Sequence, residues 1–189
     1  MRNKKIWIFN ATNDFVGNPK WLFIYVNKYR KDIDAYWMCD NVHVVNYVKS
    51  LGFNAELFHS KKAEKIKSVA GVFVVHQVKE HIPVKFENEV VILNLWHGVG
   101  IKPIERFVDS PGIRYRTYKK YIKYNEMYHN NQLFLVTSPL MEQHFTKMLN
   151  LDEDQIIRAG YPANMFNKVE FRSFDHSIKR HKGCLLYTS

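Results

Sequence analysis

The chain has 189 residues, of which 46% are hydrophobic, so a packed globular domain is expected rather than a disordered segment. Lysine and arginine number 28 against 18 acidic residues, and the net charge of +10 favours anionic partners such as phosphate-rich substrates, anionic lipid or nucleic acid. The two cysteines, Cys39 and Cys184, predict neither a disulfide framework nor a zinc site, which fits a reducing cytoplasm. No signal peptide and no membrane-spanning segment are expected.

Strand-like and helix-like segments alternate along the chain, which is typical of βαβ units built around a parallel sheet. Short apolar runs predict strands at 6–9, 35–38, 55–58, 72–75, 90–95, 133–136 and 156–157. Helices are predicted at 19–29, 42–51, 61–68, 115–127 and 140–149. This order of elements predicts an α/β fold with a Rossmann-like, doubly wound parallel sheet.

Local signals mark several helix ends. Asn18 is expected to cap the first helix and Ser138 the last one, while Gly52 is expected to end the second. The lysines of the helix at 61–68 are expected to point outward. From Phe171 onward the periodic pattern fades, and no further element is predicted.

The strand at 90–95 is expected to be buried, and it leads directly into a Trp-His-Gly turn. Ligands of open α/β sheets bind beyond the carboxyl ends of the strands, so His97 would stand at such a site. Gly98 and Gly100 would let the backbone approach a substrate, and Lys102 adds a positive charge nearby. This combination favours chemistry on an anionic substrate, although a histidine after a strand is often only a packed residue.

Two helix N-termini offer further candidate contacts. Asn18 and Lys20 open the first helix, where free amides and a lysine can hold a phosphate or carboxylate; the alternative is a plain cap beside a solvated lysine. Ser138 has the same place after its strand, as a cap first and a ligand contact second. The remaining histidines have no convergent spacing, so no metal site is predicted. The chain also lacks a glycine-rich phosphate loop and a nucleophile elbow.

Three segments carry longer motifs in a fixed order. They read G-N-P-K-W-L-F-I-Y-V at Gly17–Val26, L-W-H-G-V-G-I-K-P-I-E at Leu95–Glu105, and T-S-P-L-M-E-Q-H-F followed by L-D-E-D-Q-I-I-R-A-G-Y-P-A-N within Thr137–Asn164. Together they resemble the CDP-glycerol glycerophosphotransferase family, the teichoic-acid polymerases and primases of bacterial envelopes. The resemblance covers about residues 5–167. It departs from the family pattern after Pro162, where Ala163 and Met165 replace charged residues.

The resemblance implies the N-terminal half of a two-domain, GT-B-like architecture. Residues 1–167 would form the Rossmann-like, acceptor-side domain. Residues 168–189 would begin a truncated region between the domains, and the last of them do not look native. The second Rossmann-like domain, which holds the nucleotide in the family, is not expected within these 189 residues, so the fragment alone is expected to be inactive.

The implied reaction transfers glycerol phosphate from CDP-glycerol to a hydroxyl of a lipid-linked or polymer acceptor in envelope polymer synthesis. By resemblance His97 is the base that removes the hydroxyl proton. Phosphate or acceptor contacts would come from Gly98, Gly100, Lys102, Asn18, Lys20 and Ser138. No cofactor is implied, because the donor CDP-glycerol would bind mainly in the missing domain.

A dense basic region is present at 102–123, with tyrosines between the charges: Lys102, Arg106, Arg114, Arg116, Lys119, Lys120 and Lys123. It is either a solvated helix with one tyrosine face on the core or a surface that faces an anionic membrane or phosphate polymer. No nucleic-acid-binding motif accompanies it, so nucleic acid is not the expected partner. With a lipid-linked acceptor, the region predicts a cytoplasmic protein that is peripheral on the inner face of the membrane.

Two other functions remain open. A GT-B glycosyltransferase that uses a nucleotide sugar in surface polysaccharide synthesis would have a similar fold and a similar base histidine. The chain is alternatively a non-catalytic module that binds membrane or polymer through its basic face.

Overall fold

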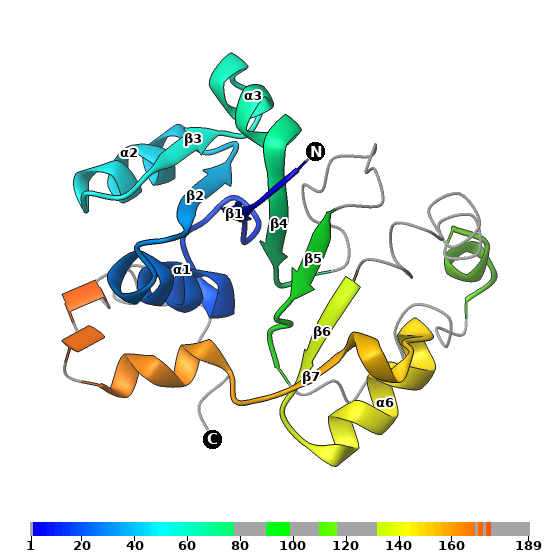
Figure 1. Cartoon of the computed structure of the whole chain (residues 1–189). Helices are drawn as coiled ribbons and strands as arrows, with labels where there is room; N and C mark the ends of the chain where they lie inside the picture. The colour runs from blue at the N-terminus through cyan, green and yellow to red at the C-terminus, as the bar shows by residue number, and fades with distance from the viewer. Residues whose placement is uncertain are drawn as a thin grey trace.

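The computed structural model describes residues 2–77, 90–98, 110–116, 132–168, 170–171 and 173–174. Its centre is a sheet of seven strands in the order β3-β2-β1-β4-β5-β6-β7, and each neighbouring pair is parallel (Figure 1). The strands are β1 (Asn3–Phe9), β2 (Asp34–Cys39), β3 (Ala55–Leu57), β4 (Ala70–Val75), β5 (Val91–Asn94), β6 (Gln132–Val136) and β7 (Ile156–Arg158).

Helices connect these strands: α1 (Gly17–Tyr29), α2 (Val42–Ser50), α3 (Lys61–Val69) and α6 (Pro139–Leu149). Two 3-10 helices, η2 (Glu153–Gln155) and η3 (Pro162–Asn167), flank β7. The Rossmann-like α/β prediction is confirmed, and the predicted strands agree with the structure apart from small differences at their ends. The helix predicted at 115–127 lies mostly outside the described residues, which include a helical segment at 111–116.

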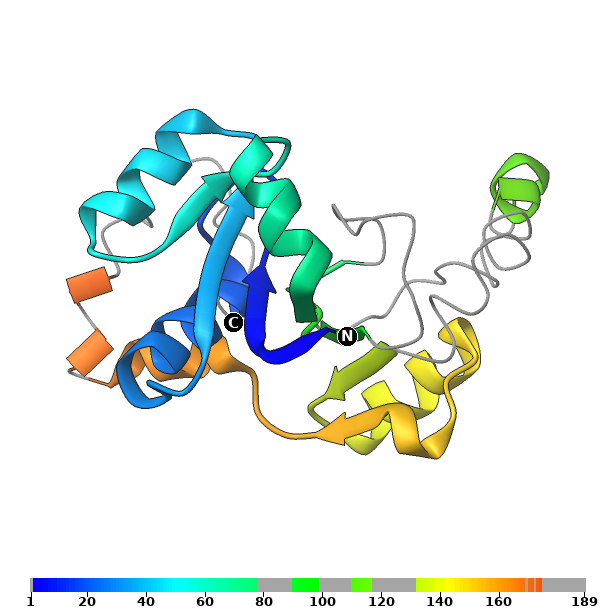
Figure 2. The ribbon, with the colours of Figure 1, turned by 45° about the horizontal axis from the view of Figure 1, so that its top comes forward.

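Helices cover both faces of the sheet (Figures 1 and 2). Phe9 and Val74 are register partners on β1 and β4, and they share a core cluster with residues of α1 and α2. Ile8 and Phe73 are the register partners on the opposite face, where they cluster with residues of α3. Phe134 lies on that second face by register and packs against α6. This alternation follows from the two-residue period of each strand and makes the sheet doubly wound.

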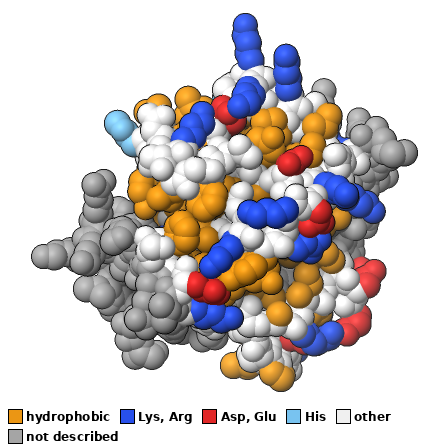
Figure 3. Space-filling model, turned by 60° about the vertical axis from the view of Figure 1, so that its left-hand side comes forward, with side chains coloured by type: hydrophobic (Ala, Val, Ile, Leu, Met, Phe, Trp, Pro, Cys, Tyr) orange, Lys and Arg blue, Asp and Glu red, His pale blue; other side chains and the backbone are white. Residues whose placement is uncertain are grey.

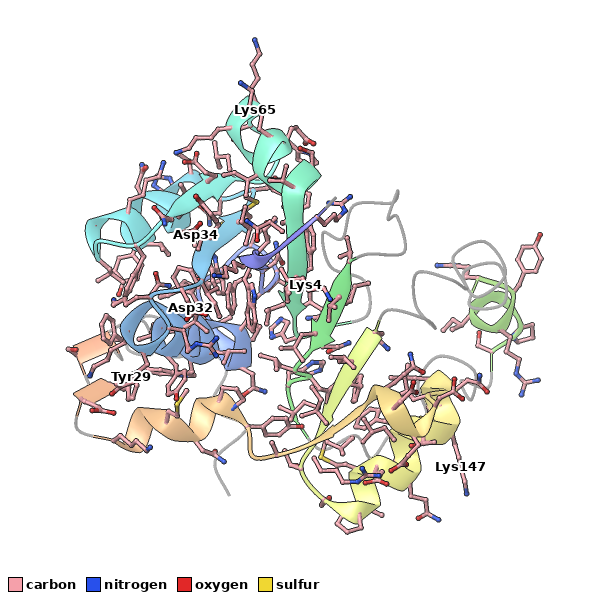
Figure 4. The ribbon with its side chains drawn as sticks, in the orientation of Figure 1. Lys4, Tyr29, Asp32, Asp34, Lys65 and Lys147 are labelled. Atoms are coloured by element: carbon pink, nitrogen blue, oxygen red, sulfur yellow. The ribbon has the colours of Figure 1, made fainter. Side chains whose placement is uncertain are left out.

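The chain beyond β7 returns to α1 and packs against it (Figure 1). Phe171 is only 1% exposed and belongs to the main core cluster, and Phe174 packs against the same cluster. Tyr29 points from α1 toward this segment, with its ring centroid 6.4 Å from that of Phe171 (Figure 4). A domain boundary at residue 167 stays a prediction, but the packed part of the chain extends beyond it.

Surface charges of both signs are interspersed on the face that carries α1 and α2, with apolar side chains between them (Figure 3). Lys65 points away from α3 and Lys147 away from α6 (Figure 4). The expectation that all lysines of α3 point outward is wrong for Lys67. Its side chain is buried against the ring of Phe58, with Nζ 4.0 Å from the ring centroid and 2.6 Å from a carboxylate oxygen of Glu64.

The helices of the described part of the chain include none that is long and apolar enough to cross a lipid bilayer. Of the seven basic residues in the region 102–123, only Arg114 and Arg116 belong to the described residues, and both are exposed.

The close approach of β1 to β4 depends on Gly71. A Cβ atom at this position would lie 2.8 Å from the carbonyl oxygen of Asn3 and 2.9 Å from Cα of Lys4, and both are backbone atoms. Gly71→Ala is therefore expected to lower the free energy of unfolding by about 1–3 kcal/mol, the usual cost of overpacking. Urea unfolding followed by circular dichroism measures the change.

Gly160→Ala is the matched control, because a Cβ atom there would meet no described atom within 4 Å. Equal losses of stability in the two variants would contradict the close-contact explanation.

Candidate active site

The segments that follow β1, β4 and β5 meet at the carboxyl edge of the sheet (Figure 1). From β1 the chain continues outward to β2 and β3 and then crosses to β4 on the other side of β1, so the strand order reverses between β1 and β4. His76 follows β4, His97 follows β5, and Gly17 opens α1 after β1. Doubly wound folds bind ligands at such a reversal, so the predicted turn lies at the expected place.

The His97 side chain is exposed, and a main-chain carbonyl group orients it. Its Nδ1 atom lies 2.7 Å from the carbonyl oxygen of His76. Because a carbonyl oxygen only accepts hydrogen bonds, Nδ1 carries the hydrogen and donates it. In the neutral imidazole Nε2 is then the nitrogen with a free lone pair, and this is the form that a general base requires.

Trp96 has an unusual backbone conformation immediately before His97. Its φ of 51° lies in the left-handed region, which a bulky side chain rarely adopts. The indole ring is 8% exposed, stacks on the His97 ring at 4.3 Å and packs edge-on against Phe145 at 5.0 Å. The Trp96 amide donates a hydrogen bond of 3.0 Å to Oδ1 of Asn94. Strained residues of this kind cluster at functional sites, which strengthens the assignment of the site to this turn.

His76 contributes a second imidazole, which the sequence reasoning did not single out. It is 7% exposed, and its ring centroid lies 5.6 Å from that of His97. Gly17 fits against it with a φ of 68°, and a Cβ atom there would lie 2.9 Å from Nδ1 of His76. The sequence feature that could have indicated His76 is its position directly after a buried strand.

Asn18 is not the cap of α1, because the helix begins at Gly17 and Val16 occupies the cap position without a side-chain bond. The Asn18 side chain is 4% exposed and bonds main-chain groups of distant segments. Its Nδ2 donates to the carbonyl oxygens of Leu95 and Trp96, and its Oδ1 accepts from the Ala163 amide. The side chain of Asn18, one of the candidate phosphate or acceptor contacts, is thus engaged within the protein.

Lys20 is 2% exposed, whereas a solvated or phosphate-binding lysine was considered from the sequence. Its Nζ donates a hydrogen bond of 2.8 Å to the carbonyl oxygen of Phe174 and lies 4.6 Å from the ring centroid of Trp21. The ammonium group therefore connects the start of α1 with the packed segment that follows η3.

Ser138 caps α6 as predicted, with Oγ accepting a hydrogen bond of 3.3 Å from the Met141 amide. It also lines a groove of about 790 Å³ between the N-terminus of α6 and the end of β7. Arg158 and Glu142 line the same groove and form a two-point ion pair, with both N–O distances at 2.8 Å. The hydrogen bonds from Arg158 lower the pKa of the Glu142 carboxyl group. The groove lies where β6 and β7 end and α6 begins.

Of the glycine turn itself, Gly98 is described, whereas Gly100 and Lys102 lie outside the described residues. A Cβ atom at Gly98 would meet no described atom within 4 Å. The described part of the chain contains no group of three or more acidic, histidine or cysteine side chains that could hold a metal ion.

Tyr161 contacts the turn at Gly98, and it was not predicted as a site residue. Its hydroxyl group donates a hydrogen bond of 2.9 Å to the carbonyl oxygen of Gly98. Burial raises the pKa of the Tyr161 phenol, so the group remains a hydrogen-bond donor at neutral pH. The sequence offered only the Gly-Tyr-Pro motif at 160–162, with no indication of its partner.

Comparison with solved structures identifies the class of fold. The structure of the wall teichoic acid polymerase TagF matches with a TM-score of 0.72 at 18% identity, over 95% of this chain and 44% of TagF. A histidine-to-asparagine variant of TagF gives 0.72 at 19% identity, with the same coverage of 95% and 44%. A glycosyltransferase from Rickettsia africae ESF-5 gives 0.52 at 14% identity, over 95% of this chain and 50% of that protein. At these identities the likeness shows the fold alone, a Rossmann-like α/β domain.

The family is identified by sequence. The sequence model described as CDP-Glycerol:Poly(glycerophosphate) glycerophosphotransferase matches residues 1–184, and the chain belongs to this family. Among curated proteins no significant match was found. The chain spans less than half the length of TagF.

Removal of the Tyr161 hydroxyl tests the hydrogen bond that this group donates to the Gly98 carbonyl oxygen. Tyr161→Phe is expected to lower the free energy of unfolding by about 0.5–1.5 kcal/mol, the usual worth of one hydrogen bond. Because the phenol pKa is raised in the folded protein, this contribution is fully present below the ordinary phenol pKa of about 10 and is lost as pH rises through the higher folded pKa.

Urea unfolding at pH 7 and at pH 9 should therefore give the same difference between Tyr161→Phe and the parent chain. Tyr25→Phe is the control, because that side chain is 39% exposed on α1. A loss for Tyr161→Phe no larger than that of the control would contradict the role of the hydroxyl.

Proposed function

We propose that the chain is the acceptor-side domain of an enzyme that transfers glycerol phosphate from CDP-glycerol to a hydroxyl group in teichoic-acid or related envelope polymer synthesis. Membership of the glycerophosphotransferase family supports the reaction class. The observation that carries the proposal is the His97 imidazole, which is exposed at the strand-order reversal with Nδ1 bonded to the His76 carbonyl oxygen. The acceptor in this proposal is lipid-linked or polymeric.

The proposed step forms one bond to phosphorus and breaks another. The oxygen of the acceptor hydroxyl attacks the phosphorus atom of the glycerol phosphate, and the bond from that phosphorus to the bridging pyrophosphate oxygen breaks. CMP leaves with the electron pair of this bond, and the hydroxyl proton passes to Nε2 of His97. Histidine suits this task because it exchanges a proton near neutral pH.

The remaining catalytic contribution is alignment of the reactants and stabilisation of charge on the phosphate oxygens. Lys102 is proposed to offset that charge as a point charge, while Gly98 and Gly100 leave room for the backbone to approach the substrate. Asn18 and Lys20 act within the protein through their main-chain hydrogen bonds. The donor nucleotide is proposed to bind in a second domain of GT-B type, and no cofactor takes part.

A nucleotide-sugar glycosyltransferase remains the alternative enzyme. The fold likeness to the Rickettsia protein is compatible with it at a TM-score of 0.52. Supplying the intact enzyme with CDP-glycerol or with nucleotide sugars, and following CMP or nucleoside diphosphate release in the presence of acceptor, separates the two reactions.

Substitution of His97 tests the proposed base in the intact enzyme. His97→Gln keeps a hydrogen-bonding side chain but does not accept the proton, so the turnover rate should fall by about 100- to 10,000-fold. The affinity for CDP-glycerol should barely change, because the donor is proposed to bind on the other domain. Steady-state transfer of radiolabelled glycerol phosphate gives both quantities.

His43→Gln serves as the control, since this histidine is exposed on α2, away from the turn. A folded His97→Gln enzyme with a normal turnover rate would refute the base assignment. Loss of folding in His97→Gln would instead favour a packing role for the imidazole.

The proposed site of action is the inner face of the membrane, with the region 102–123 facing anionic lipid. Flotation assays should give binding to anionic vesicles that weakens with salt, because exposed charges are screened over about 10 Å at 0.1 M salt. Replacing both Arg114 and Arg116 with glutamine should weaken binding by about 1 kcal/mol per residue.

The matched control replaces two exposed lysines of α3, Lys61 and Lys65, with glutamine. Equal binding of the parent chain to neutral and anionic vesicles would exclude the electrostatic explanation. Equal losses of vesicle binding in the two double variants would show that binding depends on net charge and not on the region 102–123.

A further inference from the structure

The side chain of Asn18 joins three segments that lie far apart in the sequence. Nδ2 donates to the carbonyl oxygen of Leu95 at 3.3 Å and to that of Trp96 at 2.8 Å. Oδ1 accepts from the amide of Ala163 at 3.1 Å. A primary amide has two N–H donors and one acceptor oxygen, so both kinds of group are used. At 4% exposure this side chain is part of the interior and is poorly placed to bind a ligand from solvent.

One of these bonds reaches the peptide group that precedes the candidate base. The carbonyl group of Trp96 and the amide of His97 belong to the same planar unit, so fixing one fixes the other. Trp96 itself is in the left-handed region, with a φ of 51°. A bulky residue stays there only where its surroundings impose the conformation.

The surroundings hold Trp96 at both of its polar main-chain groups. Asn94 accepts a hydrogen bond of 3.0 Å from the Trp96 amide through Oδ1, and Asn18 donates to the Trp96 carbonyl oxygen. Both asparagines are buried, at 0% for Asn94 and 4% for Asn18. Asn94 is a neighbour along the chain, whereas Asn18 comes from α1 and thus ties the turn to the first βα unit of the sheet.

We propose that Asn18 is a positioning residue for the transfer reaction. It holds the Trp96–His97 peptide in the orientation that directs Nδ1 of His97 to the His76 carbonyl oxygen and leaves Nε2 available to the acceptor hydroxyl. The inference rests on the proposed role of His97 as the base, and it assigns Asn18 no contact with substrate.

Asn18→Leu tests this role in the intact enzyme, because leucine has a similar size and makes no hydrogen bond. The turnover rate should fall by about 100-fold, the effect expected when a catalytic group is displaced by about 1 Å. The KM for CDP-glycerol should stay unchanged. The control is Asn27→Leu on the same helix, since the Asn27 amide bonds only the Phe23 carbonyl oxygen among the described contacts, at 2.9 Å; its turnover rate should stay normal.

Asn18→Asp provides a readout that a merely structural role would not change. A protonated carboxyl group donates to the Trp96 carbonyl oxygen and accepts from the Ala163 amide, but an ionised carboxylate donates nothing and faces two carbonyl oxygens. The activity of this variant relative to the parent enzyme should therefore fall as pH rises through the pKa of the new carboxyl group. A ratio that is constant with pH in a folded variant would count against the proposal.

A spectroscopic measurement separates this inference from the proposed function. Nitrogen-15 NMR of the imidazoles in the 189-residue chain should give a single Nδ1–H tautomer for His97, and this preference should be lost in Asn18→Leu or, if that variant does not fold, in Asn18→Asp at high pH. If the parent enzyme transfers no glycerol phosphate, the proposed function fails and the tautomer result still decides the role of Asn18. A folded variant with an unchanged tautomer and a normal turnover rate would overturn the inference.

Discussion

The left-handed backbone of Trp96 is the constraint on which the candidate active site depends. A conformation of this kind costs about 1–3 kcal/mol, and the structure offsets that cost locally. Each main-chain hydrogen bond from Asn94 and Asn18 contributes about 0.5–1.5 kcal/mol, and the indole ring is buried against Phe134 and Phe145. Glycine at position 96 would remove the strain together with this packing. The strain is therefore tied to the same side chain that stacks on His97.

The first turn of α1 holds the turn after β5 and the segment that leaves the sheet. Asn18 bonds both of them, and Lys20 bonds the carbonyl oxygen of Phe174. A buried ammonium group is costly without partners, and the bond to Phe174 together with the nearby Trp21 ring offsets part of that cost for Lys20.

Short-range sequence signals predicted the strands, the helix starts and the turn that carries His97. Apolar runs located the strands, the Ser-Pro pair located the start of α6, and a strand leading into a glycine turn located His97. The polar contacts that shape the site join residues far apart in the sequence: Asn18 to Trp96 and Ala163, and Tyr161 to Gly98. Neither periodicity nor capping preference carries information about such partners. The same limit explains why Asn18 was expected to be a cap and Lys20 a surface residue.

A carbonyl oxygen, and not a carboxylate, orients the His97 ring, so a protonated imidazole would need another group to compensate its charge. In a Ser-His-Asp triad a carboxylate both orients the ring and compensates its positive charge. At this turn the His76 carbonyl oxygen orients the ring and supplies only a dipole. In the proposed reaction, the positive charge formed when Nε2 takes a proton would lie against the face of the Trp96 indole, whose ring centroid is 4.3 Å from that of His97. Attraction between a cation and an indole face is worth about 0.5–2 kcal/mol, so under this proposal Trp96, whose backbone orients His97, would also stabilise the protonated imidazole.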